Sequence, residues 1–266
     1  MALNPIIYFR PDLSFEKERE AAERHFTCVP RRTAIPANSL VIPRYSALPF
    51  NKELCEDLEA MGSTPINTYK EHCYVADLRN WYYDLGELTP RTWFALDQIP
   101  VEGPFVLKGQ TNSKKHQWST HMFARDRYEA GEVFGRLCED GYVGHQQIYI
   151  RQYEPLVKLA DGLHGLPISK EFRFFVLDNQ IIASGFYWSS HADDLDRRYS
   201  SAEVPVEFIR EVLAKVRDKI RFYVFDVAQT KAGRWILIEL NDGQQSGLSE
   251  IDPDNFYKTL RTKLNQ

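Results

Sequence analysis

The chain has 266 residues and a formal net charge of −4, and 43% of its residues are hydrophobic. This is an ordinary globular composition that fits one large domain or two closely packed ones, and it carries no overall signature of nucleic-acid binding. The sequence has no run of about 18 apolar residues and does not begin with the basic and apolar segments of a secretory signal. We therefore expect a cytoplasmic protein with no membrane segment and with reduced thiols at its four scattered cysteines, Cys28, Cys55, Cys73 and Cys138.

The part of the chain before about residue 95 mixes short strands with helices. Thr89 and Pro90 have the residue types of a helix N-cap and first turn, so they predict a helix that continues through Ala95. The other elements expected here are strands at 5–9 and 39–42 and helices at 15–25 and 52–61.

The later part of the chain is richer in strands. Asp178 and Asn179 separate two apolar runs and predict a tight turn between paired strands. The fold class is therefore α+β, with an antiparallel sheet built late in the chain. The expected strands are 104–108, 147–152, 171–177 and 180–187, and the expected helices are 127–137, 206–222 and 253–264.

Near the C-terminus, two apolar runs carry oxygen-bearing side chains toward one place. Asp226 lies on the first run, and Glu239 and Asn241 lie two residues apart on the second, so they point to the same face of a strand. Residues 229–234 read as a hairpin turn that brings Asp226 opposite Glu239. Three hard oxygen ligands on such a platform suit Mg²⁺, although a solvated edge hairpin with a polar face would show the same pattern.

Basic residues follow or interrupt other apolar strands. Lys108 ends a strand and is followed by a polar loop that contains Lys114 and Lys115, which is suited to binding phosphate but is also compatible with a plain surface turn. Glu171 and Arg173 share one face of an otherwise apolar strand. A half-buried arginine needs an anion, which can be a phosphate, Glu171 or another carboxylate.

The order of these parts resembles the ATP-grasp superfamily over residues 92–266, and the thirteen-residue step from Asp226 to Glu239, followed by Glu-x-Asn, is similar to its metal motif. Residues 44–50, 75–81 and 108–115, the last reading KGQTNSKK, resemble a little-characterised bacterial and phage clade of that superfamily with paired lysines. The resemblance implies a smaller α/β N-terminal domain at 1–91 and an ATP-grasp domain at 92–266. Within the latter, two α+β subdomains grip ATP, a lid at about 104–152 and a metal-bearing part at about 153–266.

The resemblance also implies roles for matching residues. Lys108 would reach the α- and β-phosphates, and Lys114 or Lys115 would cover them. Arg173 would face the terminal phosphate, and Glu171 would lie near the ribose. Adenine would lie against the hinge formed by Gln152, Tyr153 and Glu154, and two Mg²⁺ ions would be held by Asp226, Glu239 and Asn241. In a departure from many relatives, residues 183–188 supply no further basic side chain.

The implied reaction is ATP-dependent ligation through an acylphosphate, in which Arg173, Lys114 and Lys115 assist phosphoryl transfer to a carboxylate. We expect the acceptor to meet the loop after the metal strand, at Gln244 and Ser246, with Arg44 and Tyr45 across the cleft. The alternatives are an RNA-end or RNA-modifying ligase and a non-catalytic nucleotide-binding regulator, and the acceptor and the oligomeric state stay open. An RNA substrate would need a basic, aromatic groove built from Arg31, Arg32, Arg44, Lys114, Lys115, Tyr45, Trp81 and Trp118.

Overall fold

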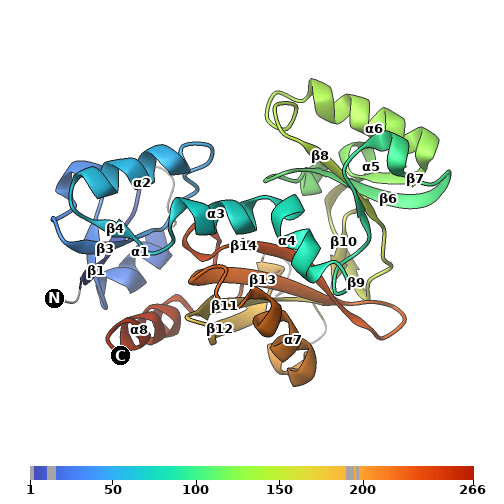
Figure 1. Ribbon diagram of the computed structural model, residues 1–266. Coiled ribbons are helices and arrows are strands. Elements are labelled where there is room, and N and C mark those ends of the chain that lie inside the picture. The colour runs from blue at the N-terminus through green and yellow to red at the C-terminus, as the bar shows by residue number, and fades with distance from the viewer. Residues whose placement is uncertain (1–2, 11–15, 190–194, 196–197) are drawn as a thin grey trace.

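The structure is a computed structural model that describes residues 3–10, 16–189, 195 and 198–266. Within these residues it contains three four-stranded sheets and one two-stranded sheet, and it confirms the predicted α+β class. Figure 1 shows a parallel sheet on the left, a second sheet with a covering helix at the upper right, and a larger antiparallel sheet below and between them. In the described part of the chain, no helix combines the length and the apolar character that a membrane crossing requires.

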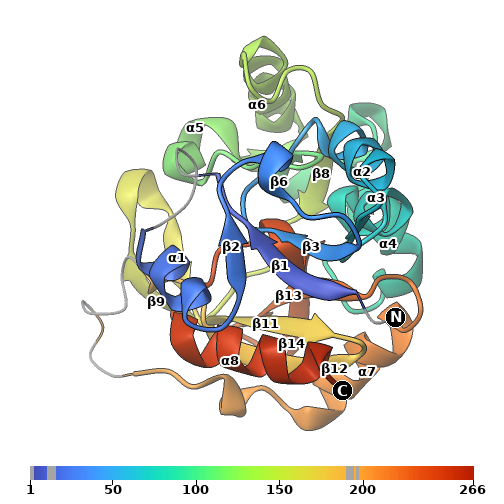
Figure 2. The same ribbon diagram turned by 90° about the vertical axis from the view of Figure 1, so that its left-hand side faces the viewer.

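The N-terminal sheet is parallel, with the strand order β2 (Thr27–Val29), β1 (Asn4–Tyr8), β3 (Ser39–Pro43) and β4 (Thr64–Pro65). From β1 the chain moves to one side to form β2 and then to the other side to form β3, so the direction of winding switches between β1 and β3. Helix α1 (Glu16–Glu23) packs on the face that carries Ile7, and helix α2 (Asn51–Ala60) packs on the face that carries Ile6. Figure 2 shows this sheet in front of the larger one, with α1 and the C-terminal helix α8 (Pro253–Leu264) beside each other.

The second sheet is antiparallel, in the order β5 (Thr92–Trp93), β8 (Ile148–Gln152), β6 (Glu102–Gly109) and β7 (Phe123–Asp126). One face, with Phe105 and Leu107, packs against helix α6 (Arg127–Glu139). Because side chains alternate along a strand, Val106 and Lys108 point to the opposite face. That face lies toward the large sheet.

The large sheet has the order β12 (Gln180–Phe186), β11 (Glu171–Leu177), β13 (Phe222–Gln229) and β14 (Trp235–Asp242), with all neighbours antiparallel. Asp178 and Asn179 join β11 to β12 with φ angles of 48° and 60°, the left-handed backbone of a tight hairpin turn, which confirms that prediction. The predicted hairpin between β13 and β14 is also confirmed, and Gly233 provides its positive φ of 85°.

The two faces of the large sheet meet different parts of the chain. Phe174 and its same-face neighbours pack with helices α4 (Leu78–Leu85) and α7 (Val206–Val216). Phe175, on the other face, packs with α8 and with residues of the N-terminal sheet. Glu171 and Arg173 share the face of Phe175 but lie nearer the end of the strand that approaches the second sheet.

Two expectations differ from the structure, and two helices were not expected. The predicted helix at 89–95 is wrong, because Thr92 pairs with Arg151 of β8 and this long-range pairing overrides the local capping pattern. The predicted helix at 206–222 ends at Val216, since Asp218 adopts a φ of 63° and Phe222 already begins β13. Helices α3 (Tyr69–Ala76) and α4 were not predicted. The proposed domain boundary at residue 91 stays a prediction, and it falls between α4 and β5.

Candidate functional site

A cavity of about 170 Å³ lies between the second sheet and the large sheet. Strands β6 and β8 supply one wall, with Val106, Lys108 and Arg151, and strands β11 and β14 supply the other. Five basic side chains (Lys108, Lys115, Arg151, Lys158 and Lys231) and three acidic ones (Glu154, Glu171 and Glu239) line it. The excess of basic groups suits an anionic ligand such as a polyphosphate.

One region of the cavity is an apolar slot beside the end of β8. Gln152, Tyr153 and Glu154 line it together with Val106, Met122, Leu156 and Ile236. The backbone N–H of Tyr153 donates to the carbonyl of Pro104 at 3.0 Å, and Glu154 accepts from Arg234 at 3.2 Å, so the segment is held in place. A flat aromatic ring fits an apolar slot that borders a strand end with backbone polar groups.

Lys108 and Glu239 form an ion pair across the two sheets. Burial alone would raise the pKa of Glu239, but the charges of Lys108 and Lys115 outweigh burial and, with a hydrogen bond from Asn241, lower this pKa to about 2. Glu239 is therefore ionised at neutral pH and is held between two lysines.

A β-bulge sets the direction of Glu239. Asp226 pairs with Glu239 and Val227 pairs with Leu237, which leaves Ile238 as the extra residue of β14. Both Ile238 and Glu239 line the cavity. The carbonyl of Ile238 accepts a hydrogen bond from Arg151 at 2.7 Å, so an arginine of the second sheet binds the bulge of the large sheet.

Arg173 and Asp226 lie directly opposite each other on β11 and β13 and form a buried fork. The guanidinium donates to both carboxylate oxygens, at 2.9 and 2.8 Å, and also to the carbonyl of Gly247 at 2.8 Å. The ring of Tyr187 lies 4.8 Å from the guanidinium carbon. The anion that the sequence required for Arg173 is therefore Asp226 in this structure.

The two adjacent lysines of the polar loop point to different places. The ammonium group of Lys115 lies in the cavity, donates to the hydroxyl of Tyr187 at 2.6 Å and lies 5.1 Å from the ring of Trp188. Lys114 instead forms an ion pair with Asp140 at 2.6 Å, beyond the end of α6. The geometry therefore distinguishes two residues that the sequence left equivalent.

Glu171 lies in the cavity with one carboxylate oxygen hydrogen-bonded to Ser169 at 3.1 Å and the other without a partner in the described part of the chain. Burial is the main cause that raises its pKa, to about 7; Lys115 opposes the shift and Asp226 adds to it. Glu171 and Glu239 thus share one cavity with opposite pKa shifts.

The four predicted acceptor residues lie outside this cavity. Arg44 is buried and donates to Glu18 and to the carbonyls of Gly243 and Ser246, at 2.6 and 2.8 Å for the two carbonyls. Gln244 and Ser246 are buried too, and both hydrogen-bond to Asp242, the last residue of β14. Tyr45 lies under the N-terminal sheet and contacts Tyr8.

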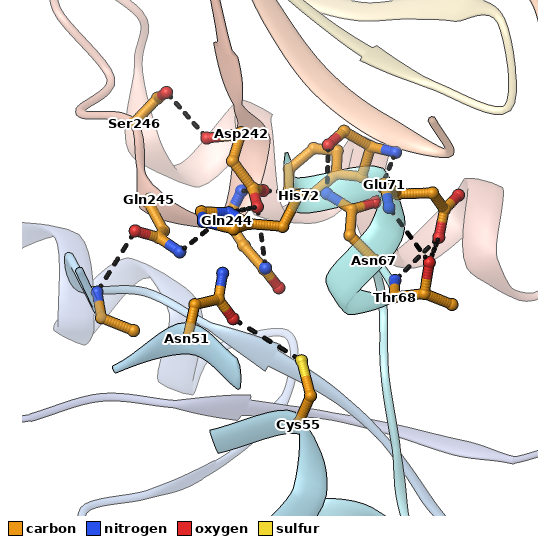
Figure 3. Close-up of polar contacts among 12 residues, drawn as sticks. Asn51, Cys55, Asn67, Thr68, Glu71, His72, Asp242, Gln244, Gln245 and Ser246 are labelled. Carbon is orange, nitrogen blue, oxygen red and sulfur yellow. Dashed lines mark hydrogen bonds and ion pairs between the residues drawn. The ribbon is translucent and has the colours of Figure 1, made fainter. Parts of the chain in front are cut away.

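Figure 3 shows the polar network around Asp242. Its carboxylate accepts from Asn67 at 2.8 Å and from Gln244 at 2.9 Å, and it contacts His72 at 2.9 Å. Asn67 and His72 come from the segment before α4, so the network fixes the loop after β14 to the N-terminal part of the chain. The acceptor roles of Arg44 and Gln244 stay predictions, and their burial favours a positioning role.

Arg151 is the main cavity residue that the sequence analysis missed. It is buried, its hydrogen-bond partners are Thr89 and the Ile238 carbonyl, and its Nε has no partner among the residues that the structure describes. Burial lowers its pKa to about 10. A charge inside the apolar run Ile148–Gln152 was the available signal, because a charged side chain in a core strand needs a compensating group.

The oxygen donors near the cavity suit magnesium. Over residues 3–10, 16–189, 195 and 198–266, no three His, Cys, Asp or Glu side chains are grouped as a metal site. Glu239 and the amide of Asn241 are hard donors on one strand, whereas Asp226 is already bound by Arg173. Glu239 and Asn241 together fit Mg²⁺, which takes few protein ligands and completes its shell with phosphate and water.

Two antiparallel sheets face each other across the cavity. One carries Lys108 on β6, the other carries Asp226 and Glu239 on the hairpin of β13 and β14, and this arrangement defines an ATP-grasp fold. Residues 95–260 match the family described as ATP-grasp domain, R2-K clade family 3, and the chain belongs to that family. No curated protein matches the chain.

Solved structures share this fold over nearly the whole chain. D-cycloserine synthetase DcsG has 12% identity and a TM-score of 0.63, over 98% of this chain and 100% of that chain. A RimK domain ATP-grasp protein from Sphaerobacter thermophilus has 16% identity and a TM-score of 0.62, over 98% and 99%. The ATP-grasp ligase PsnB, complexed with minimal precursor, Mg and ADP, has 10% identity and a TM-score of 0.61, over 99% and 100%. At such identities the likeness establishes the fold, and it confirms the ATP-grasp architecture expected from the sequence.

Proposed function

We propose that this chain is an ATP-dependent ligase that activates a carboxylate as an acylphosphate for attack by an amine or another nucleophile. The observation that carries the proposal is the convergence of Lys108 and Lys115 on the half-buried carboxylate of Glu239, beside an apolar slot. A nucleotide would place its base in the slot, against Gln152, Tyr153 and Glu154, with its ribose toward Glu171. Its phosphates would then meet the lysines.

Lys108 and Lys115 would exchange partners when the phosphates bind. Without a ligand, both lysines neutralise Glu239. A polyphosphate offers them several negatively charged oxygens, and the exchange would free Glu239, with Asn241 beside it, to hold Mg²⁺. Bound magnesium would neutralise the charge of the β- and γ-phosphates. The PsnB structure, which is described as containing Mg and ADP, supports this use of the fold.

The chemical steps need positioning and charge neutralisation from the protein. A carboxylate oxygen of the acceptor attacks the γ-phosphorus, the bond to the β-phosphate oxygen breaks, and ADP leaves. Arg173 and Lys115 would stabilise the transferred group. Lys114 lies on the same loop as Lys115 but outside the cavity. The nucleophile then attacks the acyl carbon, and phosphate leaves with the electron pair of the broken C–O bond. An amine nucleophile loses a proton in this step.

The test is a screen for ADP or AMP release with pooled amino acids, peptides and 5′- or 3′-phosphorylated RNA. We expect ADP release with an acceptor pool, and a loss of at least about 100-fold in Glu239→Gln, because one ligand charge is removed where the metal neutralises the phosphates. Circular dichroism would confirm that the variant is folded. Equal Mg²⁺-dependent turnover in a folded Glu239→Gln protein would refute the assignment of Glu239. ATP binding without any turnover would favour a regulator.

The structure separates the residues that were expected to form a groove for RNA. The groove expected for RNA required Arg44, Tyr45 and Trp81 on the surface, and all three are buried, at 6%, 8% and 1% exposure. Lys115 lies in the cavity and Lys114 is paired with Asp140. These residues therefore do not form the single surface groove that was expected, and RNA stays in the screen as a substrate pool.

A further inference from the structure

A second cavity, of about 420 Å³, lies at the carboxyl ends of the parallel strands of the N-terminal domain. Arg10 comes two residues after β1, and Tyr45 and Ser46 follow β3; all three line the cavity. The winding of this sheet switches direction between β1 and β3. In open α/β sheets, ligands bind in the crevice at such a switch point, outside the carboxyl ends of the strands.

The lining combines two arginines and several apolar groups with one acidic residue, Glu53. The guanidinium carbon of Arg10 lies 5.8 Å from the centre of the Tyr45 ring. Arg32 also lines the cavity, and it pairs with Glu53 and Asp57, whose side chains are 60% and 46% exposed. Exposed ion pairs contribute little stability, so a bound anion can replace them at small cost. Phe50, at 63% exposure, offers an apolar surface on the same rim.

This cavity is linked to the loop after β14 by the side chain of Gln245. The backbone N–H of Ala47, which lines the cavity, donates to the amide oxygen of Gln245 at 3.2 Å. Figure 3 shows Gln245 reaching from the loop after β14, next to Asp242, toward the N-terminal ribbon. Gln245 follows Glu239 by six residues, so the chain between them spans at most about 20 Å.

We propose that this cavity binds the acceptor by an anionic group that does not react. Arg10 and Arg32 would hold a carboxylate or phosphate, and Tyr45 and Phe50 would hold an adjacent apolar group. The reacting carboxylate would extend past Ala47 and Gln245 toward Glu239. The inference rests on the proposed ligase function for the role of the ligand, but the binding site itself can be tested without turnover.

The probes are phenylacetate, phenyl phosphate and the uncharged phenylacetamide, with binding to the full chain measured by NMR titration. Phenylacetate or phenyl phosphate should bind, and the tighter of the two identifies the preferred anion. Phenylacetamide should bind at least tenfold more weakly. Arg10→Gln and, separately, Phe50→Ala should weaken anion binding at least tenfold. Arg24→Gln, a matched change just after α1 at an exposed ion pair with Asp254, should leave anion binding unchanged.

The outcomes separate this site from the ligase proposal. Calorimetry should give the same ATP affinity for Arg10→Gln and the unaltered protein, and any acceptor found in the screen should show a KM raised at least tenfold in Arg10→Gln. Anion binding that depends on Arg10 in a protein without ATP turnover would support the site while the ligase function fails. Equal probe binding in Arg10→Gln, Phe50→Ala and the unaltered protein would overturn the site, even if turnover is found.

Discussion

Replacing Glu171 by glutamine should stabilise the protein above pH 7 and leave its stability nearly unchanged at pH 4. The folded protein raises the pKa of Glu171 from its ordinary value of 4.5 to about 7, chiefly by burial. A carboxyl group with a raised pKa contributes stability that is complete below pH 4.5 and is lost as the pH rises through 7. Glutamine keeps the shape of the protonated carboxyl group and does not ionise.

The size of the effect follows from the pKa shift. Each pH unit between the two pKa values changes the free energy of unfolding by about 1.4 kcal/mol, so the full difference is about 3 kcal/mol. Glu239 gives the contrasting case, because its pKa is lowered to about 2. Its contribution is present above pH 4.5 and is lost as the pH falls toward 2, so Glu239→Gln should destabilise the protein at pH 7 by a similar amount.

The assay is urea unfolding from pH 4 to pH 8, in EDTA and without nucleotide. The difference in unfolding free energy, Glu171→Gln minus the unaltered protein, should grow by about 3 kcal/mol across this range, with its midpoint near pH 6. Ser169→Ala is a useful control, since it removes the hydrogen bond to Glu171 but leaves the buried carboxyl group. Parallel pH curves for Glu171→Gln and the unaltered protein would show that Glu171 is not shifted by burial, and the account of the cavity would fail.

Three further predictions concern nucleotide binding. Lys108→Ala should weaken ATP binding in calorimetry by roughly 1.5–3 kcal/mol, the contribution of a hydrogen bond to a charged group, and unchanged affinity would mean that its role is confined to Glu239. Lys115→Ala should lower turnover much more than Lys114→Ala, because Lys115 alone of the pair lines the cavity; equal effects would contradict the assignment. Amide hydrogen exchange in residues 109–118 should slow when ATP and Mg²⁺ bind, since this polar loop carries Lys115, and exchange that ignores the nucleotide would argue against a lid.

The sequence predicted features that depend on local pattern. The hairpin that sets Asp226 opposite Glu239 follows from strand alternation and a turn with glycine, and the pairing register confirms it. The Asp178–Asn179 turn follows from the tolerance of these two residues for a positive φ.

Features that depend on contacts between distant residues could not be predicted from local sequence patterns. The partner of Arg173 lies 53 residues away, and no local pattern distinguishes Asp226 from Glu171 as the anion. The bulge at Ile238 has no sequence signal of its own, although it decides where Glu239 points. The expected helix after Thr89 failed for the same reason, since Thr92 is committed to a strand by a partner far along the chain.

The hydrophobic core crosses the boundary of the family match. That match begins at residue 95, yet Trp81 of α4 belongs to the core under Phe174, and Phe9 after β1 belongs to the core around Phe175. A fragment cut at the start of the match would present these buried aromatic faces to water and would lack the layer that covers them. The chain should therefore melt in a single cooperative transition, and the part that the family match covers is not a transferable module.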